Sequence, residues 1–392
     1  MQPSRTVSSS DQALHGGPVW AQNAVLKRPR MTASGPKPEL TPRRHPNTLT
    51  TQTTVERVTG LAAPRWVPLA MRLGAHMPTR GGVWRALERG AQLGCEVVQL
   101  FVKNNMQWFG RPLAPPELDL YANTRAGCAL AAVFGHTGYL INVAAPPSTN
   151  RDHSIRSLIQ EVQLAASLDL PFLVLHPGAH LGQGEEHGLR QAAAALDEVF
   201  AATRELPVRI ALENTAGQGT CLGYRLEHLA ALYDMVQQPA RLGVCLDTAH
   251  LFAAGYDLRQ AGAWDAVVAE VSRLVGLDQI LAVHLNDSKA PLGSRVDRHA
   301  GIGQGHLGAE AFRPLLNDPR FADTPGCLET PKSPDLHEDA ENLAVLRSLL
   351  GPHPAPKHAP GVSAAGGPRP ARLTRPVARK TVAPPARRRS PT

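Results

Sequence analysis

The chain has 392 residues, of which 43% are hydrophobic and 19% are charged, so it can form one large domain or two of ordinary size. It has no run of about 18 consecutive apolar residues, which excludes an ordinary transmembrane helix and predicts a protein with no membrane partner. Its five cysteines are odd in number and form no CxxC pair, which is typical of a reduced, intracellular protein.

The net charge of +8 is concentrated at the two ends of the chain. Residues 1–69 carry nine Lys/Arg against three acidic residues, and residues 352–392 carry nine against none, which leaves −7 for residues 70–351. Both ends are rich in Pro, Ser, Thr and Ala and poor in large apolar residues, so they cannot bury enough surface to fold alone. We therefore predict a folded domain between two disordered basic tails, which attract polyanions in a salt-dependent way. For the N-terminal tail, a merely solvated segment or a start site assigned upstream of Met31 or Met71 is an equally good interpretation.

Eight apolar runs of strand length follow one another along the predicted domain. They are nearly continuous in apolar character, as in strands of a parallel sheet that helices cover on both faces. In chain order the predicted strands are 71–76, 97–102, 129–136, 172–177, 209–215, 241–248, 280–287 and 326–331.

Segments with a helical spacing of apolar residues lie between these runs. The clearest predicted helices are 82–94, 154–170, 185–206, 226–237, 262–276 and 337–351. A strand followed by a helix, eight times over, is the pattern of a (β/α)8 TIM barrel, a fold of about 250 residues. The sequence therefore predicts an α/β protein of this fold.

Seven of the eight predicted strands end in a histidine or an acidic residue. These residues are His76, His136, His176, Glu213, Asp247, His284 and Glu329. In a TIM barrel the carboxyl ends of the strands meet at one mouth, so we expect most of these side chains to converge there. A single strand-end histidine, such as His76, is more often a hydrogen-bonded structural residue than a ligand. His180 is left out because Pro177 and Gly178 interrupt the helix that a metal-binding pair with His176 would need.

Three further candidates follow predicted strands as parts of loops. His250 comes three residues after Asp247, while Asp297 and His299 stand two apart, a spacing that lets both side chains point the same way from extended backbone. Carboxylates and imidazoles crowded into one cavity are costly without cations between them, so we predict a metal cluster. Histidine and carboxylate ligands without cysteine favour Zn²⁺, or else Mn²⁺ or Fe²⁺, in two or three sites. The predicted ligands are His136, His176, Glu213, Asp247, His250, His284, Asp297, His299 and Glu329.

A run of glycines follows His299. Gly303, Gly305 and Gly308 match the pattern GxGxxG, but they come after a polar loop rather than a strand, so we reject a dinucleotide-binding site. The glycines are predicted instead to let the loop turn closely around the metal site.

Nine segments resemble the successive signatures of the endonuclease IV family. They are LGAH (73–76), KNNMQW (103–108), HTGYLIN (136–142), LHPGAHL (175–181), LENTAGQG (212–219), DTAHLFAAGYD (247–257), HLNDSK (284–289), GSRVDRH (293–299) and LETP (328–331). The resemblance covers roughly residues 71–350 in order, and all nine predicted ligands match ligand positions of the family. It implies a zinc-dependent apurinic/apyrimidinic endonuclease.

The resemblance implies three zinc ions. The first would be held by His136, His176 and Glu213, the second by Glu213, Asp247, His284 and Glu329, and the third by His250, Asp297 and His299. Such enzymes cut DNA 5′ to an abasic site, leave a 3′-hydroxyl and a 5′-deoxyribose phosphate, and trim blocking groups from 3′ ends. The implied mechanism is attack by a hydroxide that the three ions activate, with Glu213 or Glu329 as the catalytic carboxylate that orients or deprotonates it.

The resemblance also implies DNA-binding residues, and here the sequence departs from the family. Tyr139 and Gln107 are present, but Met106 stands where the family usually has an arginine. Methionine can insert between base pairs as an apolar wedge but lacks the cationic contact. We therefore expect weaker binding or a changed lesion preference, unless Arg111 or Arg80 compensates.

A second departure is Gln304, in the glycine run. It stands where the family usually has a glutamate, so one carboxylate near the third ion is missing. Both departures concern loops that contact DNA and leave the predicted ligands untouched.

The expected partner is double-stranded DNA with abasic sites or blocked 3′ ends, bound by a monomer in the cytoplasm, in association with the nucleoid. Two alternatives stay open. A sugar isomerase or epimerase of the same barrel type would have no need for the third site at His250, Asp297 and His299. A catalytically silent DNA-binding protein that relies on its basic tails is disfavoured by the intact set of ligands.

Overall fold

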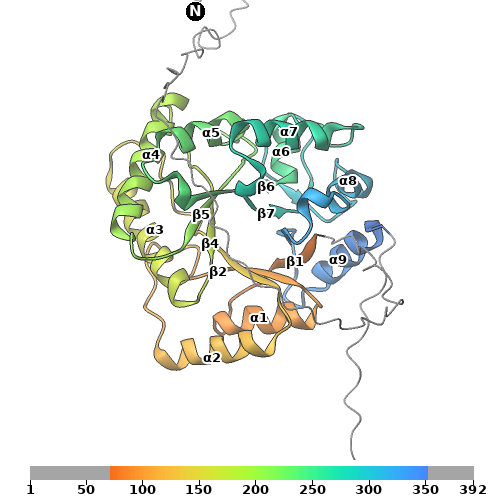
Figure 1. Cartoon of the computed structure of the whole chain (residues 1–392), viewed down its shortest axis with the longest axis horizontal. Helices are drawn as coiled ribbons and strands as arrows, with labels where there is room; N and C mark the ends of the chain where they lie inside the picture. The colour runs from red at the N-terminus through yellow and green to blue at the C-terminus, as the bar shows by residue number, and fades with distance from the viewer. Residues whose placement is uncertain (1–70, 352–392) are drawn as a thin grey trace, which may run out of the picture. The chain divides into compact units, whose positions relative to one another are not determined.

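The structure, a computed structural model, describes residues 71–351 (Figure 1). The two predicted basic tails, 1–69 and 352–392, lie outside the described residues.

Eight parallel strands close into a barrel (Figure 1). The hydrogen-bonded order is β1-β10-β7-β6-β5-β4-β3-β2, so each strand pairs with its predecessor and the last closes against the first. The strands are β1 (Arg72–His76), β2 (Val97–Phe101), β3 (Ala132–His136), β4 (Phe172–Leu175), β5 (Arg209–Glu213), β6 (Leu242–Asp247), β7 (Ile280–His284) and β10 (Pro325–Leu328). The predicted TIM barrel is confirmed. Seven predicted strands contain the observed ones, and the eighth begins one residue earlier than expected, at Pro325.

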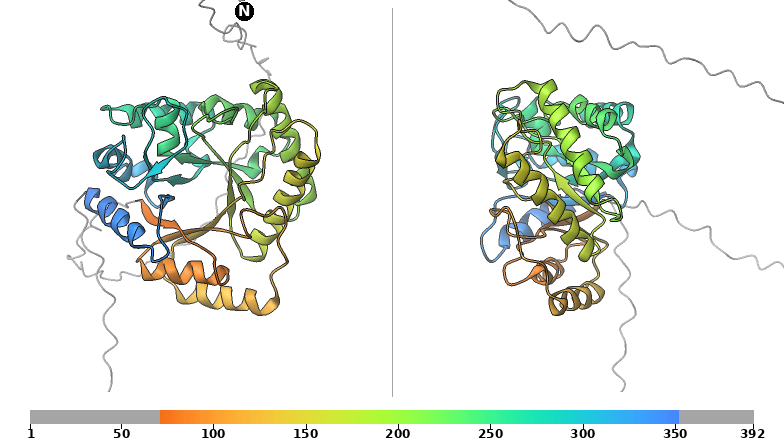
Figure 2. Two further views of the ribbon diagram at one scale, coloured as in Figure 1. Left: turned by 180° about the vertical axis from the view of Figure 1, so that it is seen from behind. Right: turned by 90° about the vertical axis from the view of Figure 1, so that its left-hand side faces the viewer.

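Helices form an outer ring around the barrel, seen from both sides in Figures 1 and 2. They are α1 (Val83–Gln92), α2 (Pro115–Gly127), α3 (Thr149–Ser167), α4 (Glu185–Ala202), α5 (Leu226–Met235), α6 (Thr248–Ala254), α7 (Ala263–Leu274), α8 (Arg313–Leu316) and α9 (His337–Leu349). After β7 a small antiparallel sheet pairs β8 (Asp287–Ser288) with β9 (His299–Ala300). Among the described residues, no helix combines the length and apolar character needed to cross a membrane.

Three of these helices, α2, α6 and the four-residue α8, are not predicted from the sequence. Helix α2 begins with two prolines and buries only Tyr121, so it has no clear apolar stripe. Helix α6 is buried on nearly all sides: six of its seven residues are buried, so it has no polar face that would reveal a helical period in the sequence. The prediction that His250 lies in a loop is therefore wrong. Asp247 starts α6 by accepting a hydrogen bond from the backbone N–H of His250 at 2.7 Å.

The apolar core has an outer and an inner part. The outer part packs the helices against the barrel, and the inner part fills the barrel itself. In β5, for example, Ile210 and Leu212 point outward while Ala211 points inward. The inner cluster consists of Phe134, Phe172, Val174, Ala211, Cys245, Ala282 and Cys327. Because side chains two apart in a strand share a face, the next inward residue on each strand lies nearer the carboxyl-end mouth.

Candidate metal centre at the barrel mouth

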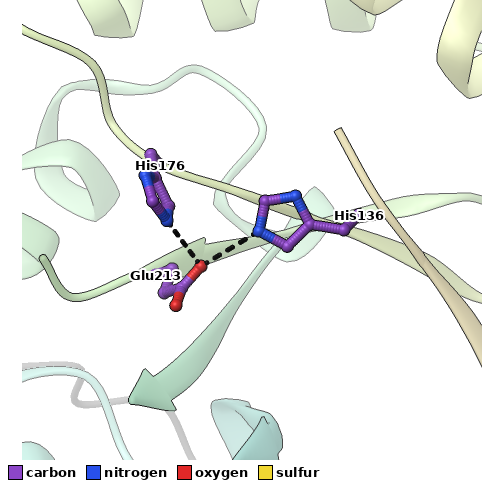
Figure 3. A group of neighbouring side chains, drawn as sticks. All are labelled: His136, His176 and Glu213. Carbon is purple, nitrogen blue, oxygen red and sulfur yellow. Dashed lines mark hydrogen bonds and ion pairs between the residues drawn. The ribbon is translucent and has the colours of Figure 1, made fainter. Parts of the chain in front are cut away.

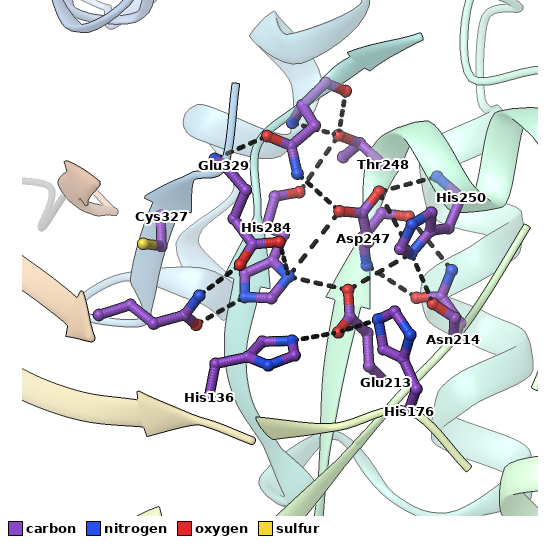
Figure 4. Close-up of polar contacts among 12 residues, drawn as sticks. His136, His176, Glu213, Asn214, Asp247, Thr248, His250, His284, Cys327 and Glu329 are labelled. Carbon is purple, nitrogen blue, oxygen red and sulfur yellow. Dashed lines mark hydrogen bonds and ion pairs between the residues drawn. The ribbon is translucent and has the colours of Figure 1, made fainter. Parts of the chain in front are cut away.

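Six of the predicted ligands stand at the carboxyl ends of strands and face inward. Each follows a member of the inner cluster by two residues. The pairs are Phe134/His136, Val174/His176, Ala211/Glu213, Cys245/Asp247, Ala282/His284 and Cys327/Glu329. The convergence of these side chains in Figure 4 thus follows from the period of two in a β-strand.

His136, His176 and Glu213 form the first group of potential ligands (Figure 3). The Nε2 atoms of His136 and His176 lie 3.3 and 3.0 Å from Oε2 of Glu213. Nδ1 of His136 lies 2.8 Å from the backbone oxygen of Thr137, which can only accept, so Nδ1 carries a proton. In neutral His136 the lone pair of Nε2 then faces a carboxylate oxygen. Two acceptors at this distance require a proton or a metal ion between them.

Glu213, Asp247, His284 and Glu329 form the second group (Figure 4). Nδ1 of His284 lies 2.9 Å from Oε1 of Glu213, 3.1 Å from Oε2 of Glu329 and 3.8 Å from Oδ2 of Asp247. Glu213, Asp247 and His284 are completely buried. Glu213 belongs to both groups, since it turns Oε2 toward the first and Oε1 toward the second.

The third group gathers around His250 on α6. Nε2 of His250 lies 3.2 Å from Oδ2 of Asp297 and 3.4 Å from Nε2 of His299. Oδ1 of Asp297 is 3.5 Å from Nε2 of His299, and Oδ2 of Asp247 is 3.8 Å from that same nitrogen. Asp297 thus contacts both histidines with which the sequence grouped it. The potential ligand group found around His250 consists of Asp247, His250 and His299, so Asp247 takes the place predicted for Asp297 in that group.

The outer nitrogens of these histidines are held by backbone. Nδ1 of His250 donates to the backbone oxygen of Asn214 at 2.9 Å, and Nδ1 of His299 donates to that of Glu329 at 3.2 Å. Both Nε2 lone pairs then point at each other and at a carboxylate. Imidazoles that bind metals are usually oriented in this way, by a hydrogen bond from the other ring nitrogen.

The electrostatics of the cluster also favour cations. Burial opposes the charged form of Glu213, but His284 and His176 outweigh it and hold the pKa of Glu213 well below its ordinary value. Burial likewise opposes protonation of His250, but Asp247 and then Asp297 raise its pKa well above the ordinary range. In the absence of metal ions, protonated histidines form ion pairs with the carboxylates. Metal ions bind by displacing such protons.

The donor set fits zinc. Five histidines and three carboxylates form the groups, Asp297 adds a fourth carboxylate in contact with two of the histidines, and no cysteine is among them. Two donors bound tetrahedrally to one zinc ion, each at about 2.0–2.1 Å, lie about 3.3 Å apart. Most separations within the three groups are close to that value. The side chains therefore already stand at the spacing that a shared small cation requires.

The glycine run bends around one buried carboxylate. Asp287 accepts hydrogen bonds from the backbone N–H groups of Gly303, Gly305, Leu307 and Gly308 at 2.9–3.1 Å. A Cβ added at Gly305 would lie 2.4 Å from Oδ1 of Asp287. The glycines do let the loop turn closely, but it turns around Asp287 rather than around the predicted ligands.

Two cavities open at this mouth. One of about 360 Å³ is lined by His136, His176, His250, Asp297 and His299. The other, of about 790 Å³, extends past His76, Arg80, Phe101 and Lys103. Tyr139, Glu329 and Pro331 line both cavities. A molecule bound in the larger cavity can therefore reach the cluster along Glu329.

The predicted DNA-binding residues lie on the rim. Met106 and Tyr139 are 64% and 66% exposed, and Gln107 beside them is also exposed. The backbone N–H of Tyr139 donates to the backbone oxygen of Asn105 at 3.2 Å, which joins the two loops. The ring of Tyr139 packs edge-on against Phe101, with 5.3 Å between the ring centroids.

The two arginines considered as substitutes at position 106 differ in their surroundings. Arg111 is engaged by both carboxylate oxygens of Glu117 at 2.5 and 2.7 Å. Arg80 lines the larger cavity, and its side chain makes no ion pair among the described residues. Arg80 is thus the better placed of the two to contact a phosphate.

Sequence reasoning missed the residues that hold the ligands. Asn286 donates to Oδ2 of Asp247 at 2.6 Å and accepts from the backbone N–H of Glu329 at 2.8 Å. Gln99 lies between His284 and Glu329. The signal for Gln99 was available, because it is the one polar residue of the apolar run VVQLFV. His76 contacts Gln99 and Glu329 but belongs to none of the ligand groups found among residues 71–351, in keeping with its expected structural role.

An eight-stranded parallel barrel with histidines and carboxylates at its carboxyl-end mouth defines a class of TIM-barrel proteins with a metal site. Residues 87–349 match the family model of the xylose isomerase-like TIM barrel. A D-tagatose 3-epimerase-like protein resembles the chain with a TM-score of 0.56 over 71% of this chain and 97% of that one. At 16% identity this likeness shows the fold alone.

More similar proteins narrow the class. "Probable endonuclease 4" of Chloroflexus aurantiacus is 50% identical over 279 residues, or 71% of this chain and 98% of the relative. "Probable endonuclease 4" of Geobacter sp. (strain M21) is 44% identical over 278 residues, with the same coverage. The crystal structure of endonuclease IV from Thermus thermophilus matches with 36% identity and a TM-score of 0.63, over 71% of this chain and 98% of that one. The chain belongs to the endonuclease IV family.

Proposed function

We propose that this protein is a DNA-repair nuclease that hydrolyses the phosphodiester bond 5′ to an abasic site. The products would be a 3′-hydroxyl and a 5′-deoxyribose phosphate, and the same site would remove blocking groups from 3′ ends. Membership of the endonuclease IV family supports action on DNA. The observation that carries the proposal is the group of nine histidines and carboxylates at the barrel mouth, with acceptors facing acceptors.

We assign one metal ion to each of the three groups, with Glu213 shared by the first two. Zinc fits the donors best, and Mn²⁺ or Fe²⁺ can replace it. When bound, such ions supply a nucleophilic hydroxide near neutral pH and neutralise charge on the leaving oxygen. The third group, at the loop that carries Asp297 and His299, lies on the exposed side of the cluster and is suited to the leaving oxygen.

The two predicted catalytic carboxylates have different surroundings. Glu213 is completely buried and contacts histidines through both oxygens, so its part is to hold the first two groups together. Glu329 lines both cavities and is 17% exposed at its side chain. We therefore assign to Glu329 the orientation of the attacking nucleophile.

The exposed residues on the rim account for recognition of the abasic site. An abasic nucleotide has no base to unstack, so turning it out of the helix costs less than for an intact nucleotide. Met106 and Tyr139, which stand exposed on joined loops, form an apolar wedge for the gap in the stack. The larger cavity beside Tyr139 then receives the sugar and its phosphates, with Arg80 at its edge.

Incision of a synthetic duplex with one tetrahydrofuran abasic analogue tests the proposal. We expect one cut, 5′ to the analogue, in the metal-loaded protein, and loss of cutting after prolonged treatment with a chelator. An undamaged duplex of the same sequence is the control, and a duplex with a 3′-phosphoglycolate end tests the trimming activity. Absence of both bound metal and site-specific nicking would favour the silent DNA-binding alternative.

A further inference from the structure

Gln99 lies beside the ligand groups and belongs to none of them. It stands in the middle of β2, is completely buried, and has only apolar neighbours in its strand. Val98 and Leu100 belong to the outer core, so Gln99 between them points into the barrel. A polar amide in such a place must find hydrogen-bond partners inside the barrel.

The partners of Gln99 are His76 and two residues of the second ligand group, Glu329 and His284. Its Nε2 lies 2.5 Å from Oε1 of Glu329 and 2.8 Å from Nδ1 of His76. Its Oε1 lies 2.8 Å from Nε2 of His284. A carboxylate can only accept, so the amide nitrogen must face Glu329 and the amide oxygen must face His284. A flipped amide would press two oxygen atoms together.

This orientation determines which nitrogen of His284 is free. Because the amide oxygen of Gln99 accepts, Nε2 of His284 carries the proton and Nδ1 presents a lone pair. That Nδ1 faces the carboxylates of Glu213 and Glu329 at 2.9 and 3.1 Å. Glu329 thus fixes the orientation of the Gln99 amide, and the amide in turn fixes the ring of His284.

His284 differs in this respect from the other histidines whose outer nitrogen has a partner in the structure. Those donate to backbone oxygens, in the pairs His136/Thr137, His250/Asn214 and His299/Glu329. A backbone acceptor stays in place whatever the side chain. The acceptor of His284 is a side chain, so a single substitution can remove it.

We propose that Gln99 is a positioning residue, which holds His284 with Nδ1 toward the second ligand group and fixes the carboxylate of Glu329. The inference rests on the proposed function, because it concerns an ion bound by that group. Gln99 touches neither substrate nor ion in this arrangement. It acts by presenting two ligands in one orientation, and thereby sets the affinity of the second group for its ion.

The hydrogen-bond network around Gln99 has an energetic cost. Nε2 of His76, the far end of the same chain of hydrogen bonds, is buried with no partner among the described residues. An apolar side chain of similar length at position 99 would leave that nitrogen unpaired and would also remove the donor to Nδ1 of His76. A purely structural role predicts that such a replacement changes stability alone, and a positioning role predicts that metal binding suffers.

The test compares Gln99→Met with a matched control. Methionine keeps the length and burial of the side chain but removes both the donor and the acceptor. We expect the affinity for one of the bound ions to fall about 10- to 100-fold, as for other residues that orient metal ligands. Metal content by mass spectrometry and zinc affinity by chelator competition are the readouts. The control is Gln279→Met, at the other end of β7, where the amide oxygen accepts from Arg209 at 2.8 Å.

A second variant guards against misfolding. Gln99→Leu also removes the donor and the acceptor but uses a branched apolar side chain like those of its neighbours in β2, so its zinc affinity should fall as in Gln99→Met. Parental affinity in Gln99→Met, or an equal loss in Gln279→Met, overturns the inference. If Gln99→Met does not fold, parental affinity in Gln99→Leu overturns it instead. A parent protein that binds no metal at all would refute the proposed function, which is a different outcome.

Discussion

Two parts of the barrel mouth differ in burial: the cluster of predicted ligands at its base (the floor) and the exposed loops around it (the rim). On the floor, buried ligands stand at strand ends, each fixed by its own strand and by hydrogen bonds to its outer atoms. On the rim, Met106 and Tyr139 are about two-thirds exposed on loops. The floor retains the full set of ligands that the family resemblance implies, whereas the rim departs from it at Met106 and Gln304. A barrel of this kind can keep its chemistry while its recognition loops change.

One buried ion pair connects the rim loops to the scaffold. Nζ of Lys103 lies 2.9 Å from Oε1 of Glu161 on α3, and their side chains are 4% and 1% exposed. Lys103 also donates to the backbone oxygen of Gln107 at 2.6 Å. Glu161 accepts from the backbone N–H of Gly138, next to Tyr139, at 3.1 Å. The loops that carry Met106 and Tyr139 are therefore both held by this ion pair.

The largest effect is expected on the floor, from Glu213→Gln. The amide keeps the shape but removes the charge that two ligand groups share, and should lower both metal content and the rate of incision, the latter by about 10³-fold or more. Metal analysis and kcat/KM on the abasic duplex measure the two effects. Glu205→Gln, at an 85% exposed side chain, is the control and should match the parent. Full metal content in Glu213→Gln would contradict the shared role.

The next effect is expected where floor and rim are joined, from Glu161→Gln. The charge of Lys103 is left buried without its partner, which should cost about 3–5 kcal/mol of the free energy of unfolding. Urea denaturation measures that loss. Glu198→Gln is the matched control, because Glu198 pairs with Arg151 at 3.1 Å but is 54% exposed, and should cost at most about 1 kcal/mol. If the two variants were equally stable, the Lys103–Glu161 ion pair would not be buried in solution.

A third variant, Gly305→Ala, tests the loop around Asp287. The added Cβ would meet Oδ1 of Asp287 and the backbone oxygen of Ser288, both at 2.4 Å. We expect a loss of about 1–3 kcal/mol of stability by urea denaturation. The control is Gly127→Ala, at the end of α2, where a Cβ would have no neighbour within 4 Å. A neutral Gly305→Ala would mean that the loop does not need this close approach.

The smallest effects are expected on the rim, from Met106→Ala and Tyr139→Ala. Each should raise KM for the abasic duplex about 10-fold, as expected for loss of a side chain that packs against bases. Metal content should stay at the level of the parent, since neither residue touches the ligand groups. Met235→Ala, at a residue of α5 that is 40% exposed, is the control. A loss of metal in either rim variant would remove the distinction between the two regions.

The sequence predicted the floor well because one simple rule governs it. Parallel strands with an inward residue at every second position place their last inward residues at one mouth, so His136 or Glu213 can be recognised without coordinates. The helix that carries His250 escaped prediction because it is buried on nearly all sides, so its sequence has no amphipathic pattern. The hydrogen-bond partners of Gln99 and Asn286 lie at the ends of strands distant in sequence, so no local pattern predicts them, even though Gln99 itself stands out as a polar residue in an apolar run.

The carboxylate of Asp247 ties local chain order to ion binding. One oxygen starts helix α6 by accepting from the backbone N–H of His250, and the other is turned toward the ring of His284. A ligand that moves Oδ2 of Asp247 therefore also acts on the first turn of α6, which carries His250. Under the proposed assignment of ions, filling the second group and ordering the third would be coupled in free energy, so removal of the ions by a chelator should be cooperative rather than a series of independent dissociations.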